Sequence, residues 1–324
     1  MTATTSSEIP LVDVRPWFEG SDAERAALAA QVDADLQRVG FLVVTGHGVP
    51  TDLPDRVRAA GHRFFGLPDE VKDRYRAHVG GRGWLAVGAE ANAYAEGGES
   101  PPDLKESFVV GSEGPVPDGP DAALFAPNVW PDEDPELRVL VEDYCTRMRA
   151  LADGLLALCA VALGEDEAFF ARHTTGPSWA FQLNWYPSRE TTGEPLPGQF
   201  RIGPHTDFGT LTLLDRQPGS GGLQVDIADV GWVDAPHVPG ALVVNTGDLL
   251  ARWSGDRWRS NRHRVLPPPA DAPGEELMSL IYFYEADPGA IVAPLAPPRG
   301  RTAGLPPVRA GQFLRDKYDA ITVA

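Results

Sequence analysis

The stretch HTDFGTLTLLDRQPGSGGLQVDI (205–227) alternates short apolar runs with turn-forming residues, and it sets the pattern for the second half of the chain. From about residue 178 onward, similar runs recur at intervals of roughly 8–12 residues, separated by Gly, Pro or Asp. The others are WAFQLNWYP (179–187), GWVDA (231–235), ALVVNTG (241–247), RHRVLPP (262–268) and LMSLIYFYEAD (277–287). Short β-rich runs at this spacing predict a sandwich or barrel.

Helical patterns dominate the first part of the chain instead. A capping box, Ser21-x-x-Glu24, opens a predicted helix over 21–39 that ends at Gly40. Further helices are expected at 51–65, 135–163 and, near the end of the chain, 307–320, with strands at 41–46 and 106–111. The rest of 80–130 is rich in Gly, Pro and acidic residues and is predicted to be loop. We therefore expect helices packed against a C-terminal β-barrel.

Charge and composition exclude several classes of partner. The 324 residues carry a formal net charge of −18, and nucleic acid and anionic membranes both favour a basic surface, so neither is expected as a partner. No signal peptide is read at the N-terminus, and the longest apolar stretch, LADGLLALCAVALG (151–164), is shorter than the ~20 residues of a spanning helix. Cys145 and Cys159 lie within a helical pattern and are expected to be buried thiols. These observations predict a cytoplasmic protein, a monomer or small homo-oligomer.

A possible metal motif begins at His205. In a strand, residues two apart face the same side, so His205 and Asp207 can converge on one point. A third ligand from a later strand would complete two histidines and one carboxylate, a set that suits Fe(II) and leaves positions open. Of the candidates, His237 lies in a turn and is expected to face solvent, whereas His263 leads into a strand. His-x-Asp alone is a weak signal, so it needs support from its context.

That context resembles the isopenicillin N synthase-like members of the 2-oxoglutarate/Fe(II)-dependent dioxygenase superfamily. The similar segments run in order over most of the chain: IPLVDV (9–14), GFLVVTGHGVP (40–50), RFFGLPDEVK (63–72), DLKESFVVG (103–111), HTDFGTLTLL (205–214), GGLQV (221–225) and GWVDAPHVPGALVVNTGDLLARWSGDRWRSNRHRV (231–265). The resemblance implies a mainly β fold with flanking α-helices, a distorted double-stranded β-helix or jelly roll. It also implies that His205, Asp207 and His263 hold the iron, and that His47 belongs to a structural turn.

The same resemblance suggests how the chain is divided. It implies an N-terminal region over 1–120 that braces the barrel, a helical connection over 121–175 and a jelly-roll domain over 176–295. A C-terminal helix and tail over 296–324, carrying Phe313 and Tyr318, would be a possible lid. The implied activity is oxidation of an unactivated C–H bond of a small molecule, by hydroxylation, desaturation or ring formation, with Fe(II), 2-oxoglutarate and O2. Such a reaction would belong to specialised metabolism, antibiotic biosynthesis included.

The expected 2-oxoglutarate pocket departs from the family pattern at one position. Family members hold the distal carboxylate with an Arg-x-Ser motif and a Tyr from an Asn-x-Tyr-Pro strand. Asn184, Tyr186 and Ser279 match, but Leu277 stands where the arginine belongs. The chain has only three lysines, Lys72, Lys105 and Lys317, and all are expected outside the barrel strands, so no lysine is expected to substitute. An arginine elsewhere could serve instead, and the candidates are Arg201, Arg216 and Arg264.

Other interpretations remain open at this point. The anchor could consist of hydroxyl groups, or the protein could be an Fe(II) oxidase or oxidative cyclase that does not use 2-oxoglutarate. A zinc hydrolase and a non-catalytic binding protein with the barrel fold are the rivals from other classes. On the substrate side, Phe283 has the same strand parity as Ser279 and is the expected wall, and Trp84 could cap the site. Trp185 is expected to face away from the site into packing.

Overall fold

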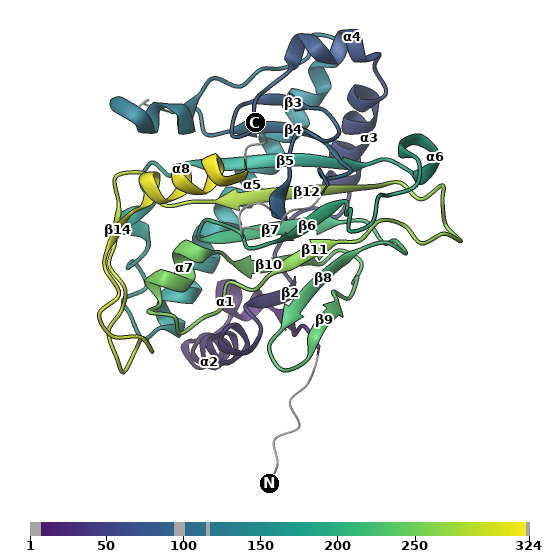
Figure 1. Cartoon of the computed structure of the whole chain (residues 1–324). Coiled ribbons are helices and arrows are strands. Elements are labelled where there is room, and N and C mark those ends of the chain that lie inside the picture. The colour runs from purple at the N-terminus through teal and green to yellow at the C-terminus, as the bar shows by residue number, and fades with distance from the viewer. Residues whose placement is uncertain (1–7, 94–100, 115–116, 322–324) are drawn as a thin grey trace.

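Two facing β-sheets form the centre of the molecule. The computed structural model describes residues 8–93, 101–114 and 117–321. The large sheet has eight strands in the order β1-β2-β10-β7-β12-β5-β4-β3, and the small sheet has four in the order β6-β11-β8-β9 (Figure 1). Apart from the parallel pair β1 and β2, every strand pair in the two sheets is antiparallel. This arrangement is the distorted double-stranded β-helix that the sequence predicted.

The strands are short, as the spacing of turn residues indicated. Those of the large sheet are β1 (Leu11–Asp13), β2 (Phe41–Thr45), β3 (Gly83–Leu85), β4 (Glu106–Gly111), β5 (Trp179–Tyr186), β7 (Leu211–Arg216), β10 (Leu242–Thr246) and β12 (Leu277–Tyr284). Those of the small sheet are β6 (Ile202–His205), β8 (Leu223–Ile227), β9 (Gly231–Asp234) and β11 (His263–Val265). A separate two-stranded antiparallel sheet consists of β13 (Ile291–Val292) and β14 (Val308–Arg309).

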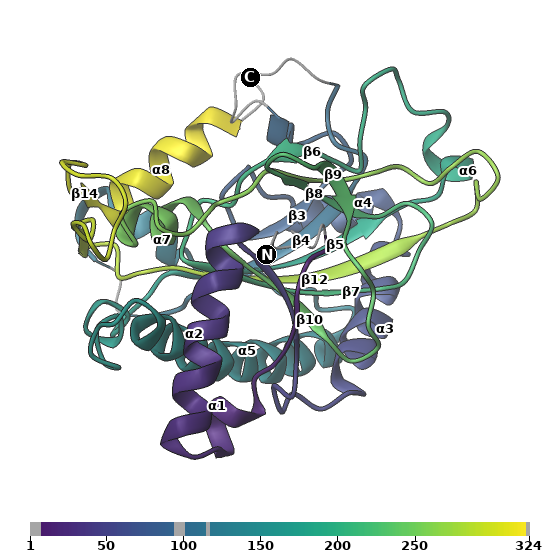
Figure 2. The same cartoon turned by 90° about the horizontal axis from the view of Figure 1, so that it is seen from below.

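Long helices cover the face of the large sheet that points away from the small sheet, whereas the C-terminal helix borders the cavity between the sheets. The helices are α1 (Arg15–Glu19), α2 (Asp22–Arg38), α3 (Leu53–Phe65), α4 (Asp69–Lys72), α5 (Pro135–Ala162), α6 (Arg189–Thr192), α7 (Asp248–Trp253) and α8 (Ala310–Ile321). Figure 2 shows α5 along this face, with the small sheet on the opposite side. The predicted capping box is present, because the Ser21 hydroxyl accepts from Glu24 N–H and the Glu24 carboxylate accepts from Ser21 N–H.

The main hydrophobic core lies between the large sheet and these helices. Along α5, buried side chains recur at helical spacing, among them Leu137, Tyr144, Leu151 and Leu155, and they pack in one cluster with strand residues such as Leu213 and Tyr282. Both cysteines are buried on this helix and carry free thiols. A second cluster, including Val43, Val225 and Val243, lies between the two sheets at the β2 end. The site between the sheets is thus supported by packed apolar layers.

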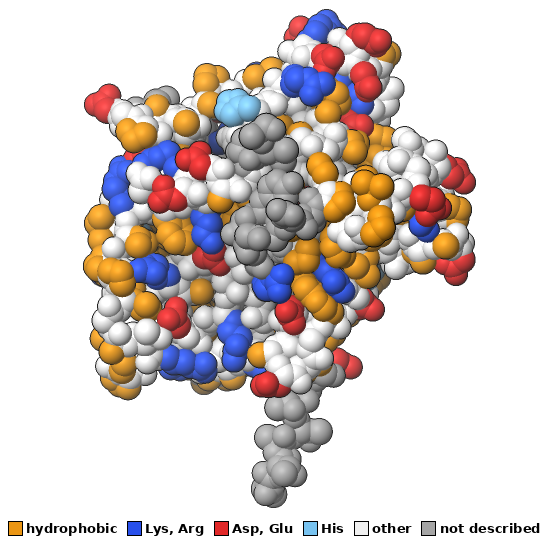
Figure 3. Space-filling model, in the orientation of Figure 1, with side chains coloured by type: hydrophobic (Ala, Val, Ile, Leu, Met, Phe, Trp, Pro, Cys, Tyr) orange, Lys and Arg blue, Asp and Glu red, His pale blue; other side chains and the backbone are white. Residues whose placement is uncertain are grey.

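Strands from the N-terminal part complete the large sheet at both edges. β1 and β2 extend it beyond β10, and β3 and β4 extend it beyond β5. β4 spans the predicted residues, whereas β3 was expected to be loop because three residues are too few to show an alternating pattern. Among the described residues, no helix is both long and apolar enough to cross a membrane. On the face shown in Figure 3, acidic and basic side chains are interspersed.

Candidate active site

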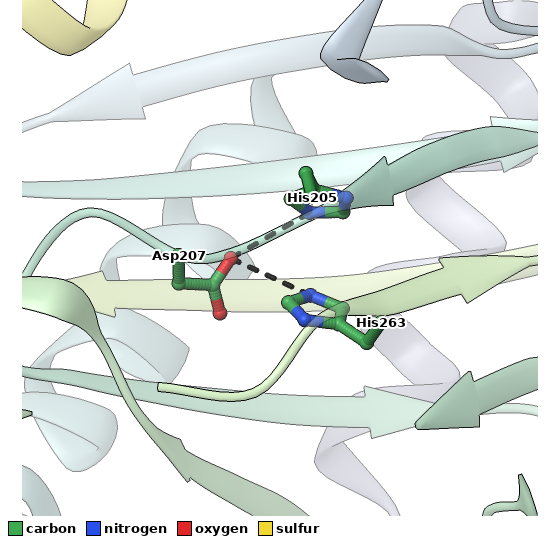
Figure 4. A group of neighbouring side chains, drawn as sticks. All are labelled: His205, Asp207 and His263. Atoms are coloured by element: carbon green, nitrogen blue, oxygen red, sulfur yellow. Dashed lines mark ion pairs between the residues drawn. The ribbon is translucent and has the colours of Figure 1, made fainter. Parts of the chain in front are cut away.

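Three metal-ligating side chains meet between the sheets. His205 is the last residue of β6, Asp207 follows two residues later, and His263 opens β11, directly opposite His205 in the antiparallel register. One ligand atom from each lies within 4.8 Å of the others. Asp207 Oδ1 is 3.7 Å from His205 Nε2 and 3.5 Å from His263 Nε2, and Figure 4 shows the three groups pointing toward one another. His237, the alternative third residue, is exposed as expected.

Hydrogen bonds orient these side chains. His205 Nδ1 lies 2.8 Å from the Gly203 carbonyl and His263 Nδ1 lies 3.3 Å from the Asn261 carbonyl. A carbonyl can only accept, so each Nδ1 carries the proton and each Nε2 lone pair faces the other ligands. Two causes, burial first and the neighbouring His205 second, lower the pKa of His263 to about 4. This imidazole is therefore neutral at physiological pH. Neutral imidazoles are the form that binds a metal.

Asp207 is held in a similar way. Asn245 on β10 donates its side-chain N–H to Asp207 Oδ2 at 2.7 Å, which leaves Oδ1 directed at the two imidazoles. Burial would raise the pKa of this carboxyl, but the two histidines and hydrogen bonds from Asn245 and Thr212 hold it below its usual value. Two imidazoles and one carboxylate on one side, with an open cavity on the other, are a donor set that fits Fe(II).

The cavity in front of the triad is lined by alternate residues of three adjacent strands. On β12 these are Leu277, Ser279, Ile281 and Phe283, and Glu285 continues the row beyond the strand. The facing rows are Ala180, Gln182, Asn184 and Tyr186 on β5, and Thr212, Leu214 and Arg216 on β7. Side chains two apart on a strand share a face, so the whole row points inward. Phe283 is therefore a wall of the cavity, as its parity predicted.

The matching co-substrate residues lie together at one end of this cavity. The Tyr186 hydroxyl is in hydrogen-bond contact with Ser279 and Asn184, and burial raises its pKa, so it remains a neutral hydroxyl group. Leu277 packs against Tyr186 and Ile202 in a small apolar cluster. Leu277 is uncharged, and the residues that this cluster contains are uncharged as well, so the cluster offers no cation for the co-substrate.

Two of the candidate arginines have other partners. Arg201 is buried, and its guanidinium donates to the Glu275 carboxylate at 3.0 Å and to the Glu275 carbonyl at 2.8 Å. Arg264 donates to Gln224 at 2.9 and 2.7 Å and stacks over Trp232. Neither residue is among those lining the cavity, whereas Arg216 is. Arg201 lies beside the predicted pocket, with its guanidinium 5.7 Å from the Tyr186 ring, but its charge is paired with Glu275. No such contact with the pocket residues is found for Arg264 among the described residues.

Trp84 also lies elsewhere. On β3 its Cα pairs with that of Phe108, and both side chains belong to the main core. Its indole N–H donates to the Glu106 carboxylate at 2.7 Å. The cavity is lined instead by the next residue, Leu85. Trp84 therefore does not cap the site, because its parity on β3 turns it to the helix-covered face. Trp185 packs outward against Phe65, and His47 bonds the Gly240 carbonyl in a turn, both as expected.

Several polar residues of the cavity were not predicted from the sequence. Lys105 directly precedes β4 and so lies outside the strands as expected, but its side chain nevertheless lines the cavity. It is buried and paired with Glu90, and it donates to Ser107 at 2.9 Å. The signal was available, because DLKESF runs straight into a predicted strand. Arg82, Asn92, Gln217 and Glu285 are further polar residues of the lining.

The C-terminal helix α8 closes one side of the cavity. Tyr318 and Ile321 contribute to the lining, and Tyr318 meets Phe208 edge to face. Lys317 Nζ lies 2.6 Å from Asp248 Oδ2 at the start of α7, which ties the helix to the loop region behind the triad. Tyr318 of the predicted C-terminal helix thus borders the cavity, whereas Phe313 is not among the lining residues, and a role of this helix as a lid stays a prediction.

These features fit an iron-dependent oxygenase, and comparison with known proteins places the chain in a family. Residues 9–133 match the family described as non-haem dioxygenase in morphine synthesis N-terminal, and residues 167–286 match the 2OG-Fe(II) oxygenase superfamily. The chain belongs to the 2-oxoglutarate/Fe(II) oxygenase superfamily and is an oxidoreductase that uses Fe(II), 2-oxoglutarate and O2 to oxidise a small molecule.

Individual relatives cover almost the whole chain. Validamycin A dioxygenase of Streptomyces hygroscopicus subsp. limoneus is 43% identical over 96% of this chain and 86% of that protein. A homoarginine-6-hydroxylase of Glycine max is 30% identical over 93% of this chain and 92% of that protein. The crystal structure of a full-length Neurospora crassa protein in complex with alpha-KG and thymine has a TM-score of 0.82 and 28% identity, covering 96% of both chains.

Proposed function

We propose that His205, Asp207 and His263 hold Fe(II), and that 2-oxoglutarate binds in the part of the cavity next to Tyr186, Ser279 and Asn184. The observation that carries this proposal is the convergence of three ligand atoms within 4.8 Å at the wall of the cavity. Bound iron with 2-oxoglutarate and O2 supplies an oxidant strong enough for an unactivated C–H bond. The chain's own residues bind, orient and shield the reactants.

Each group has a definable task. The two imidazoles and the carboxylate would hold the metal from one side and would leave the cavity side for other ligands. Asn245 fixes which oxygen of Asp207 faces the metal position. Apolar side chains such as Ile281 and Phe283 exclude water from the volume in which the substrate carbon lies. The family membership and the named relatives support a role in specialised metabolism.

We further propose a cytoplasmic monomer or small homo-oligomer that binds neither nucleic acid nor membrane. Two free, buried cysteines and a net charge of −18 support this proposal.

Anaerobic titration with Fe(II) tests the proposed site. Adding 2-oxoglutarate to the iron-loaded protein should produce the visible charge-transfer band of a chelated keto acid, and Asp207→Ala should abolish it. His237→Ala is the matched control, because this exposed histidine lies outside the site. Air should then release succinate from the wild type. A wild-type protein that shows neither band nor succinate would refute 2-oxoglutarate use, and a band retained by Asp207→Ala would refute the ligand assignment.

A further inference from the structure

The distal carboxylate of 2-oxoglutarate needs a positive partner, because an unpaired carboxylate in a buried pocket is costly. Leu277 cannot supply that charge. We infer that Arg216, on the neighbouring strand β7, is the residue that binds this carboxylate. The inference rests on the proposed function and names a residue that departs from the family pattern.

The strand register places Arg216 beside the residues that match the family pocket. The Cα of Ser279 on β12 pairs directly with the Cα of Arg216 on β7, and on its other side with that of Asn184 on β5. Adjacent strands lie about 4.8 Å apart. Arg216 therefore lies one strand to the side of Ser279. The family position, which Leu277 occupies, lies two residues from Ser279 along β12 itself. Arg216 ends the inward row of β7, after Thr212 and Leu214.

The space around the guanidinium is open. Gly221 and Gly222 line this end of the cavity, and a Cβ added to Gly222 would have Arg216 Nη1 as its nearest neighbour, at 4.0 Å. A side chain at Gly222 would narrow the volume in front of the guanidinium, whereas one at Gly221 would meet Arg201 and backbone carbonyls instead. Gly222 thus leaves room for a ligand group beside Arg216.

The charge of Arg216 also lacks a close partner. Among the described residues, no carboxylate makes an ion pair with it within 4.0 Å, and its Nε is buried without a hydrogen-bond partner. Asp234 acts on it only at longer range, and Nη2 donates to the neutral Ala235 carbonyl. By contrast, Arg201 is paired with Glu275, and Lys105 with Glu90. A partly buried guanidinium is stabilised by an anion, and bidentate binding to a carboxylate suits its geometry.

The affinity for 2-oxoglutarate tests this assignment. The charge-transfer band is titrated anaerobically in the wild type, Arg216→Leu, Arg216→Lys and the control Arg264→Leu, whose guanidinium contacts Gln224 outside the cavity. Arg216→Leu should weaken 2-oxoglutarate at least about 30-fold, equivalent to about 2 kcal/mol. Pyruvate, which has the keto-acid end but no distal carboxylate, should bind both proteins alike. Arg264→Leu should match the wild type.

A second-site exchange keeps the test decisive. Leu277→Arg in the Arg216→Leu background returns a cation to the family position and should recover most of the lost affinity. Wild-type affinity in Arg216→Leu would overturn the inference, as would equal losses for pyruvate and 2-oxoglutarate. If Arg216→Leu does not fold, the 2-oxoglutarate affinities of Arg216→Lys and of the double variant are compared with that of the wild type in its place. Absence of the band in the wild type would instead refute the proposed function itself.

Discussion

Asn245 is predicted to set the metal affinity without being a ligand. Its amide donates to Asp207 Oδ2 at 2.7 Å, and the Thr212 hydroxyl is the other side-chain donor to this carboxylate. Loss of such a supporting hydrogen bond typically weakens metal binding about 10–100-fold, or about 1.4–2.7 kcal/mol. Because Thr212 remains, Asn245→Ala should fall near the lower end of that range. Combining it with Thr212→Val should approach the upper end.

Anaerobic isothermal titration with Mn(II), a divalent stand-in that resists oxidation, measures this effect. The matched control is Asn128→Ala, since Asn128 also makes side-chain hydrogen bonds, to the Gly111 backbone at 2.7 and 2.9 Å, but does not line the active-site cavity. The control should lower the melting temperature and leave the metal affinity at the wild-type value. Equal metal affinities for Asn245→Ala and the wild type would show that Asp207 is oriented by something other than this hydrogen bond.

Two further predictions separate structural from catalytic residues. Trp84→Phe removes the 2.7 Å hydrogen bond to the buried Glu106, so it should lower the free energy of unfolding by about 1–3 kcal/mol in a denaturant titration. The substrate KM should stay unchanged. A raised KM would show that Trp84 contributes to the substrate site. For Asp33, burial raises the carboxyl pKa, but hydrogen bonds from Arg257 and Trp258 hold it below its usual value. Its stabilising effect should be complete at neutral pH and disappear as the pH falls below about 4, so Asp33→Asn should be less stable than the wild type at pH 7, with the difference closing in acid; a constant difference would contradict this account.

The sequence predicted the parts of the fold that depend on local pattern. The helix over 21–39 matches α2 to within a residue at each end because its capping box and terminal glycine are local signals. Phe283 was placed correctly because the period of two carries from Ser279 along one uninterrupted strand. Convergence of His205, Asp207 and His263 required the family resemblance, since no local pattern says which strands become neighbours.

The errors arose where position depends on the whole sheet. Trp84 lies on a strand of three residues, too short to reveal which face it presents. Lys105 lies in the cavity because β4 joins the large sheet next to β5, a pairing between segments far apart in the chain. The choice among three arginines likewise depended on their partners. Arg201 and Arg264 are occupied by Glu275 and Gln224, and only the folded structure brings those groups together.

The inward row on β12 also limits how such a site can change during evolution. Ser279 and Glu285 are six residues apart, which corresponds to about 20 Å along an extended chain. The length of the strand therefore fixes the distance between the two ends of the cavity. Inserting one residue would turn every later side chain to the opposite face, so the strand cannot be lengthened without losing its lining. The lining can therefore change in two ways: one residue of the row is substituted by another, or a residue of a neighbouring strand takes over its role. The second is what we infer for Leu277 and Arg216.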